Sequence, residues 1–343
     1  VFEGITQYMW VGAVVLILFF AASSLHLNHI YHWMDSAATN EFVIESTIGT
    51  DHPEYVAEMT DGAIENEHFD HIIAGKTAYL NQGFFWIRTL AYLGVWLFFV
   101  NLFRKRSLLE DQEGGTKIHF KNMVYSALFL VFFAYSSSAA SWDWLMSIDT
   151  HWFSTLYGWY VFSGIWVSAM ITIVLLTLYL KSKGYLKEVN KSHMHDITKW
   201  MFAISFLWSY LWFSQFVLIW YSNIPEEVTY YMTRIQYYKG LFFGVFAVNF
   251  IMPMVILMSR DAKRSIGYSL VVGLIIFIGH WLDIYLLVTP GTVGNDWNFG
   301  LMEIGTFIGF LGLFLFTVFR SLAKAPLMVK NHPFLEESKH LHI

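Results

Sequence analysis

Ionisable side chains interrupt several apolar stretches of the sequence, where a charge is costly and is therefore a candidate for function. His280 and Asp283 lie three positions apart, so they share one face of a helix. Asp143 is flanked by tryptophans, and Arg88 and Glu303 lie near the starts of two further apolar stretches. Histidine titrates near neutral pH, and burial shifts a carboxyl toward the same range, so these residue types suit the uptake and release of protons.

The segments that adjoin the apolar stretches supply four further candidates, His29, Asp35, Asp149 and His151. Aromatic residues near them could enclose a flat ring such as that of a quinone. These residues are Trp142, Trp144, Trp152, Tyr157 and Tyr160. Oxidation of a quinol releases protons, which need acceptors on the side of release. The residues therefore predict a quinol site or a proton exit path, and the alternative is that the carboxylates cap helices or lie among lipid headgroups.

Composition excludes several other kinds of site. The chain has no cysteine, which removes disulfides, iron–sulfur ligation and thioether haem attachment by this chain. His26 and His280 are the only histidines within apolar stretches, so the opposed histidine pairs of a b-type haem are missing and we expect no haem. His68 and His71 lie in an acidic segment and are expected to be solvated, so no metal site is predicted. The net charge of −5 argues against nucleic-acid binding.

The candidate residues must be positioned by membrane-spanning helices. Of the 343 residues, 56% are hydrophobic and 14% charged, whereas soluble domains have about 25% charged residues. A helix needs about 20 mostly apolar residues to cross a bilayer, and eight stretches have that length. They are residues 8–28, 83–103, 123–144, 155–180, 199–221, 240–259, 267–287 and 299–320. Lipid cannot form hydrogen bonds with the backbone, and a helix pairs its own N–H and C=O groups. We therefore predict an all-α protein, a polytopic helix bundle that forms a single transmembrane domain over residues 1–343.

The charge of the connecting segments alternates along the chain. The segments after the second, fourth, sixth and eighth stretches are rich in lysine and arginine, whereas those after the third and seventh contain neither. The positive-inside rule places the basic segments in the cytoplasm. Both ends of this chain are then predicted to be cytoplasmic, including a tail over residues 321–343. Residues 29–82 form an acidic periplasmic connection, and the candidate residues named above fall in or beside the outer part of the membrane.

Several motifs resemble one family of respiratory membrane proteins. They are residues 141–149 (SWDWLMSID), 151–160 (HWFSTLYGWY), 183–186 (KGYL), 193–196 (HMHD), 211–216 (LWFSQF), 219–227 (IWYSNIPEE), 324–327 (KAPL) and 333–338 (PFLEES). The motifs extend across essentially the whole chain and resemble the ActF subunits of bacterial alternative complex III, which belong with the NrfD/PsrC-like integral membrane proteins. The resemblance implies a subunit of a quinol:electron-acceptor oxidoreductase in the bacterial inner membrane.

The resemblance also implies an architecture and a set of partners. Such proteins are built from two four-helix bundles with peripheral helices, so two further spans are expected upstream of Val1. The expected partners are a homologous sister membrane subunit, an iron–sulfur protein, multihaem cytochromes c and a terminal oxidase. Haem and iron–sulfur clusters would belong to these partners, and menaquinone or another quinone is the ligand expected near this chain. The sister subunit is the alternative host of the quinol site, and this chain would then carry protons, bind a second quinone or hold the assembly together.

The residues leave two other functions open. A purely structural scaffold would need none of the outer carboxylates. A secondary transporter would show an inverted repeat and broken helices near the middle of the membrane, and Pro253 is the one proline within a predicted span, with no matching partner span. In each case the chain is not expected to be an enzyme by itself.

Overall fold

Eight helices are long and apolar enough to cross a membrane. The computed structural model describes residues 1–50 and 53–341. Within them the candidate spans are Phe2–Ser24, Gln82–Glu113, Thr116–Ile148, Leu156–Ser182, Lys191–Ser222, Lys239–Leu257, Ile266–Thr292 and Leu301–Leu322. Each overlaps one of the eight stretches predicted from the sequence. The prediction of a multi-pass helical bundle with eight spans is therefore confirmed.

Five spans are single helices and three are composite. The single helices are α5 (Gln82–Glu113), α7 (Leu156–Ser182), α8 (Lys191–Ser222), α13 (Ile266–Thr292) and α14 (Leu301–Leu322). The first span joins α1 (Phe2–Thr6) to α2 (Tyr8–Ser24), and the third joins α6 (Thr116–Trp144) to a short 3-10 turn (Met146–Ile148). The sixth is formed by α10 (Lys239–Phe246), a π-helical turn (Ala247–Ile251) and α11 (Met252–Leu257).

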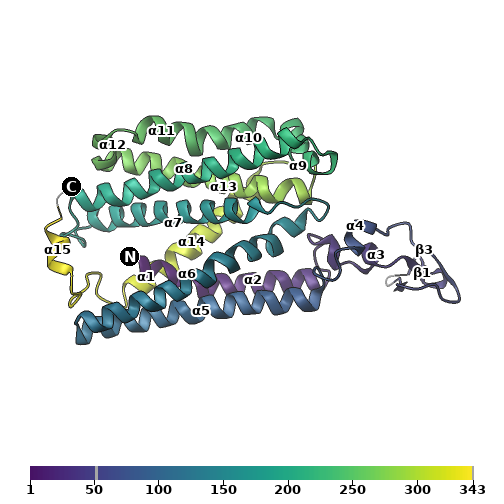
Figure 1. Ribbon diagram of the computed structural model, residues 1–343, viewed down its shortest axis with the longest axis horizontal. Helices are drawn as coiled ribbons and strands as arrows, with labels where there is room; N and C mark the ends of the chain where they lie inside the picture. The colour runs from purple at the N-terminus through teal and green to yellow at the C-terminus, as the bar shows by residue number, and fades with distance from the viewer. Residues whose placement is uncertain (51–52, 342–343) are drawn as a thin grey trace.

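The spans pack in two groups (Figure 1). Helices α7, α8, α10, α11 and α13 pack together, with α9 (Pro225–Tyr237) against their ends and α12 (Arg260–Arg264) joining α11 to α13. Helices α2, α5 and α6 lie side by side, and α14 contacts α1 and α2. Because α6 also contacts α7, it connects the two groups.

The long connection over residues 29–82 and the tail over residues 323–341 lie at opposite ends of the helices (Figure 1). We call these the connection end and the tail end. The tail end also carries the turn between α5 and α6, where Gly114 and Gly115 adopt φ angles of 68° and 89° that favour glycine. A short helix, α15 (Leu335–Lys339), lies in the tail.

The connection is partly ordered by a small sheet that the all-α prediction did not include. Its elements are α3 (Ser36–Thr39), β1 (Phe42–Ile44), β2 (Tyr55–Val56), β3 (Ala63–Glu65) and α4 (His71–Ala74). The strands are antiparallel in the order β2-β1-β3. The side-chain amide of Asn66 donates to the carbonyls of Ala37 and Asn40, at 2.7 and 2.8 Å, and so ties β3 to α3. Strands of two or three residues are too short to show the alternation from which a strand is predicted.

The core of the larger helix group is aromatic at the connection end and aliphatic beyond it. The aromatic cluster includes Trp152, Tyr157, Trp208 and Trp212, and Trp208 is fully buried. The aliphatic cluster consists mainly of isoleucine, valine, leucine and methionine side chains of α7, α8, α11 and α13. The aromatic part is therefore the part of the bundle that surrounds the ionisable candidates.

The sixth span changes its helical pitch just before Pro253. A proline has no N–H to donate to the carbonyl four residues earlier, and its ring collides with that carbonyl. The π-helical turn accommodates this and directs the fully buried Asn249 toward Gly279 of α13. A Cβ atom at Gly279 would collide with the Asn249 side chain, so this glycine permits the close approach of two spans.

Gly279→Ala is expected to destabilise the bundle, and Gly164→Ala is the matched control. A Cβ atom at Gly164 would meet Trp208 and His280 at ordinary contact distances of 3.7 and 3.8 Å. Overpacking costs about 1–3 kcal/mol, so Gly279→Ala should lower the melting temperature measured by tryptophan fluorescence in detergent, while Gly164→Ala should leave it unchanged or raise it. Equal melting temperatures for the two variants would contradict the close contact.

Candidate functional site

A buried ion pair joins α5 to α6 near the connection end. The guanidinium of Arg88 binds both carboxylate oxygens of Asp143, with Nε–Oδ2 at 2.8 Å and Nη2–Oδ1 at 2.9 Å. Asp143 is fully buried and Arg88 is nearly so. A bidentate arginine–carboxylate contact is among the strongest that side chains make. The structure therefore brings these two candidates together, and each has its counter-charge in place.

Aromatic side chains enclose the ion pair. The Arg88 guanidinium lies 3.9 Å from the centre of the Tyr79 ring and 4.2 Å from that of Phe84, and it donates to the Tyr79 carbonyl at 3.1 Å. The Tyr92 hydroxyl lies 3.4 Å from Oδ2 of Asp143. Burial, and after it the charge of Asp143, raises the pKa of Tyr79 to about 12, so its hydroxyl stays protonated at neutral pH. Cation–π contacts and hydrogen bonds thus fix the arginine on several sides.

A second buried carboxylate lies inside the larger helix group. Asp283 of α13 accepts hydrogen bonds from the Tyr160 hydroxyl of α7 and from the Trp208 indole of α8, the latter at 3.1 Å. His280 places Nδ1 3.8 Å from Oδ2 of Asp283, and its ring meets Trp208 edge-on at 5.2 Å between ring centroids. All four side chains are buried. Three helices therefore meet at one carboxylate, and both of its donors belong to other helices.

A small cavity lies beside Asp283. It has a volume of about 20 Å³, and Tyr160, Gln215 and Arg234 line it together with Asp283. Arg234 of α9 is buried, lies 3.3 Å from the centre of the Tyr230 ring and donates to the Tyr230 carbonyl at 2.9 Å. A cavity needs about 10–15 Å³ to hold one water molecule. The space beside Asp283 therefore accommodates water and is far too small for an organic ring.

Several buried polar atoms around Asp283 lack partners. Nε2 of His280, Nε2 of Gln215 and both amide atoms of Asn249 have no hydrogen-bond partner within the described part of the chain. An unsatisfied buried polar group costs about 1–3 kcal/mol, and such groups are typical of sites that hold water or react. Because Asn249 packs against Gly279, the residue before His280, these atoms extend the polar region from Asp283 toward the sixth span.

A larger pocket of about 330 Å³ lies between the end of α6 and the connection. Its walls include Tyr79, Trp142, Trp152 and Phe153. Nε1 of Trp142 is buried without a hydrogen-bond partner among the described residues. Trp152 stacks on Tyr230 with 3.9 Å between ring centroids. Since Tyr230 also lines the cavity beside Asp283, this pair of rings separates the pocket from that cavity.

Two contacts fasten the connection to the loop after α6. Nε2 of His151 lies 2.6 Å from Oδ2 of Asp70, and the Lys76 ammonium donates to the Thr150 carbonyl. Burial raises the pKa of Asp70, but hydrogen bonds, chiefly from the Ile73 N–H and from His151, outweigh burial and lower the pKa overall. His151 is largely exposed, so this sequence candidate belongs to a surface contact and lies outside the buried site.

The other sequence candidates lie apart from the two buried carboxylates. Asp35 caps α3 by accepting from the Ala37 N–H at 3.0 Å, and Glu303 caps α14 by accepting from the Gly300 N–H at 2.8 Å. His29 is exposed, and Asp149 is partly exposed in the turn after α6. The structure therefore places Arg88 beside Asp143 and His280 beside Asp283. The remaining candidates cap helices or lie in turns and at the surface.

Arg234 and Asn249 belong to the site but were not predicted. A signal for α9 was present, because Pro225 followed by two glutamates is typical of a helix start. A helix there would have brought Arg234 to the connection end. Nothing in the local sequence marks Asn249, whose position depends on the π-helical turn.

No protein-family model and no curated protein matches this chain. The site is therefore interpreted from its own chemistry. One carboxylate is held by an arginine at two points, and the other has neutral donors and a water-sized cavity beside it. The second arrangement is the candidate functional centre.

Removing Arg88 alone is expected to be more damaging than removing both members of its ion pair. Arg88→Met leaves the Asp143 carboxylate buried without its counter-charge, which costs about 3–5 kcal/mol. The double variant Arg88→Met/Asp143→Leu removes the stranded charge and should recover much of the lost melting temperature. A double variant that melts at or below the temperature of the single variant would show that the pair does more than compensate charge.

Proposed function

We propose that this chain carries protons in the connection-end half of a membrane-embedded, quinol-oxidising complex. The observation that carries the proposal is the environment of Asp283. This buried carboxylate has Tyr160 and Trp208 as donors, His280 beside it and a water-sized cavity at its side. Carboxyl and imidazole groups exchange protons near neutral pH when their surroundings tune them.

The contrast with Asp143 supports the choice of Asp283. Protonation of Asp143 would neutralise the carboxylate that binds Arg88. The arginine would then be buried without a counter-charge, which is costly. The donors to Asp283 are a hydroxyl and an indole, which are neutral, so the carboxyl group can gain or lose a proton while both contacts remain. Arg234 lines the same cavity and brings a positive charge to it.

The motif resemblance to the ActF subunits supports the wider setting. A subunit of this kind would belong to a quinol:electron-acceptor oxidoreductase in a bacterial inner membrane, with the NrfD/PsrC-like arrangement of two four-helix bundles. We assign α7, α8, α10–α11 and α13 to one of these bundles, because they pack together. Iron–sulfur clusters and haems would lie in partner subunits, and quinol oxidation would supply the protons.

The test is Asp283→Asn in the intact complex, reconstituted in liposomes. The amide keeps the shape of the carboxylate but cannot carry a proton. Its oxygen can accept from the Trp208 indole, while its NH2 group, which replaces the other carboxylate oxygen, can donate to the Tyr160 oxygen. A positioned acid–base group contributes about 100-fold or more to a rate, so quinol turnover or the coupled proton release should fall by about that factor. Tyr160→Phe should show a smaller loss, since it removes one donor and leaves the carboxyl in place.

Asp35→Asn is the matched control, because Asp35 caps a short helix in the connection and lies apart from the buried site. It should leave turnover and proton release unchanged. Size-exclusion chromatography must show that all three variants assemble. Unchanged rates in Asp283→Asn would refute the proton function and favour the structural scaffold.

A second candidate function is quinone binding in the 330 Å³ pocket beside the Arg88–Asp143 pair. Ligand pockets have volumes of about 300–1,000 Å³ and mostly apolar walls with a few polar groups. The aromatic rings of this pocket suit a flat ring, and Lys76 and Thr150 add polar groups to its lining. The tail of the ligand would remain in lipid.

Trp142→Leu removes one of the aromatic rings that line the pocket. A contact between aromatic rings contributes about 0.5–1.5 kcal/mol, which corresponds to a rise of about 3- to 10-fold in KM for quinol. Trp144→Leu is the control, since Trp144 is not among the residues that line this pocket. A photoreactive quinone should label this pocket, and labelling confined to another subunit would exclude it.

A further inference from the structure

Three metal-ligating side chains meet at the tail end, on the opposite side of the bundle from Asp283. Glu110 near the end of α5, His119 at the start of α6 and His332 in the tail each place one ligand atom within 4.8 Å of the others. Nδ1 of His119 lies 3.2 Å from Oε1 of Glu110. Glu110 is buried, and the two histidines are partly buried.

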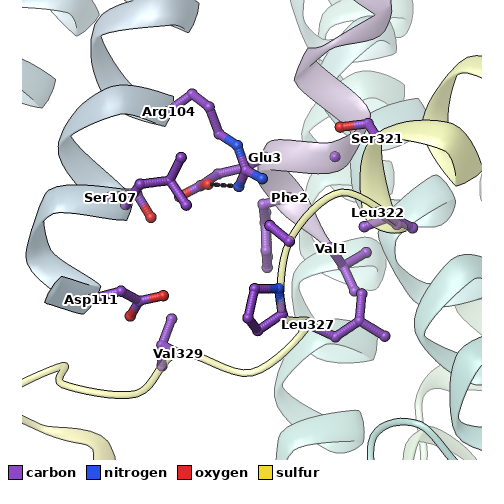
Figure 2. A pocket seen from close by; sticks show the side chains of 14 residues that line it. Val1, Phe2, Glu3, Arg104, Ser107, Asp111, Ser321, Leu322, Leu327 and Val329 are labelled. Carbon is purple, nitrogen blue, oxygen red and sulfur yellow. Dashed lines mark hydrogen bonds and ion pairs between the residues drawn. The ribbon is translucent and has the colours of Figure 1, made fainter.

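The chain brings these groups together by anchoring its tail on α5. The side chain of Asp111 accepts from the Lys330 N–H at 3.0 Å, and its carbonyl accepts from the Asn331 amide at 2.8 Å. Figure 2 shows Asp111 facing Val329 of the tail, one helical turn from Ser107, in the pocket that the Glu3–Arg104 ion pair also lines. This anchoring places the next residue, His332, beside His119, with 4.9 Å between the ring centroids.

We propose that Glu110, His119 and His332 form a binding site for a divalent transition-metal ion, with zinc as the preferred ion. Zinc binds imidazole nitrogen and carboxylate oxygen at about 2.0–2.2 Å, so two ligand atoms of a tetrahedral site lie about 3.3 Å apart. The 3.2 Å between the His119 nitrogen and the Glu110 oxygen matches this spacing. Two imidazoles and one carboxylate form a known zinc ligand set, with water in the fourth position.

A second layer of contacts orients the carboxylate. The Asn122 amide donates to Oε2 of Glu110 at 2.7 Å, and Nε of Arg106 donates to the Asn122 carbonyl oxygen at 2.6 Å. Oε2 is therefore occupied, and Oε1 faces His119. Support of this kind is typical of metal sites, where the partners of the ligands fix their orientation.

The metal would fasten a strap across the tail end. Beyond His332, the tail reaches the start of α8, where His193 contacts the Ser338 carbonyl at 2.9 Å and Asn190 donates to the Leu341 carbonyl at 3.0 Å. One end of the strap is thus held by the α5–α6 hairpin and the other by α8. The sequence predicted no metal site, because His332 joins Glu110 and His119 only through the path of the tail.

The first test is zinc binding by the whole chain in detergent, after removal of any affinity tag. The purified protein should bind an equimolar amount of Zn²⁺, measured by elemental analysis after equilibration with zinc and gel filtration. His332→Gln and Glu110→Gln should each lose this ion, whereas His340→Gln, a control in the exposed part of the tail, should retain it. Asp283→Asn should also retain it, so the metal site and the proton function can fail separately.

Asn122→Ala provides a variant that leaves all three ligands in place. Loss of such a supporting contact lowers metal affinity by about 10- to 100-fold, whereas adventitious binding to surface histidines would not change. Cobalt substitution should give the absorption spectrum of a tetrahedral Co²⁺ site in the wild type, and His332→Gln should lack it.

The last measurement is the protection of the tail from proteolysis when zinc binds. Zinc should slow tryptic cleavage after the exposed Lys330 in the wild type, and a chelator should reverse the effect. The protection should be absent in His332→Gln. No bound zinc in the wild type, or equal binding and equal protection in His332→Gln, would overturn the proposal and leave Glu110 and His119 as a simple hydrogen-bonded pair.

Discussion

A membrane interior cannot solvate a charge, and this constraint determines where the buried ionisable groups of the chain lie. Arg88 and Asp143 compensate one another across α5 and α6, and Asp283 draws two hydrogen bonds from α7 and α8. Lys263, buried at the tail end, donates to two carbonyls at the end of α11. The partner groups come from other helices or turns. Each buried charge is therefore compensated only when these elements pack together.

The constraint also explains why the two carboxylates have different properties. A two-point contact with arginine gives Asp143 a fixed environment, and the aromatic rings around Arg88 hold the pair in place. Asp283 has neutral donors, a cavity of about 20 Å³ and nearby polar atoms that have no hydrogen-bond partner among the described residues. A water molecule fits beside such a group, and no ion pair has to separate for a proton to be exchanged, so one carboxylate suits structure and the other suits exchange.

The sequence predicted the parts of the fold that depend on local composition. Eight apolar stretches were enough to locate the eight spans, and the spacing of His280 and Asp283 placed both on one face of α13. The sequence could not show that Arg88 binds Asp143, or that Arg234 reaches the cavity beside Asp283, because these contacts depend on how distant helices pack. The small sheet and the capping role of Glu303 were missed for a related reason, since both depend on short-range backbone geometry.

The order of charged residues along the chain has a consequence for membrane insertion. Arg88 precedes Asp143, and Arg234 precedes Asp283. A ribosome therefore delivers each arginine before the acidic residue that will lie near it. In the folded chain, Arg88 binds Asp143 directly, and Arg234 lines the cavity beside Asp283. The counter-charge of Asp143 is thus already present in α5 when α6 packs against it, so this ion pair can form in the order of synthesis.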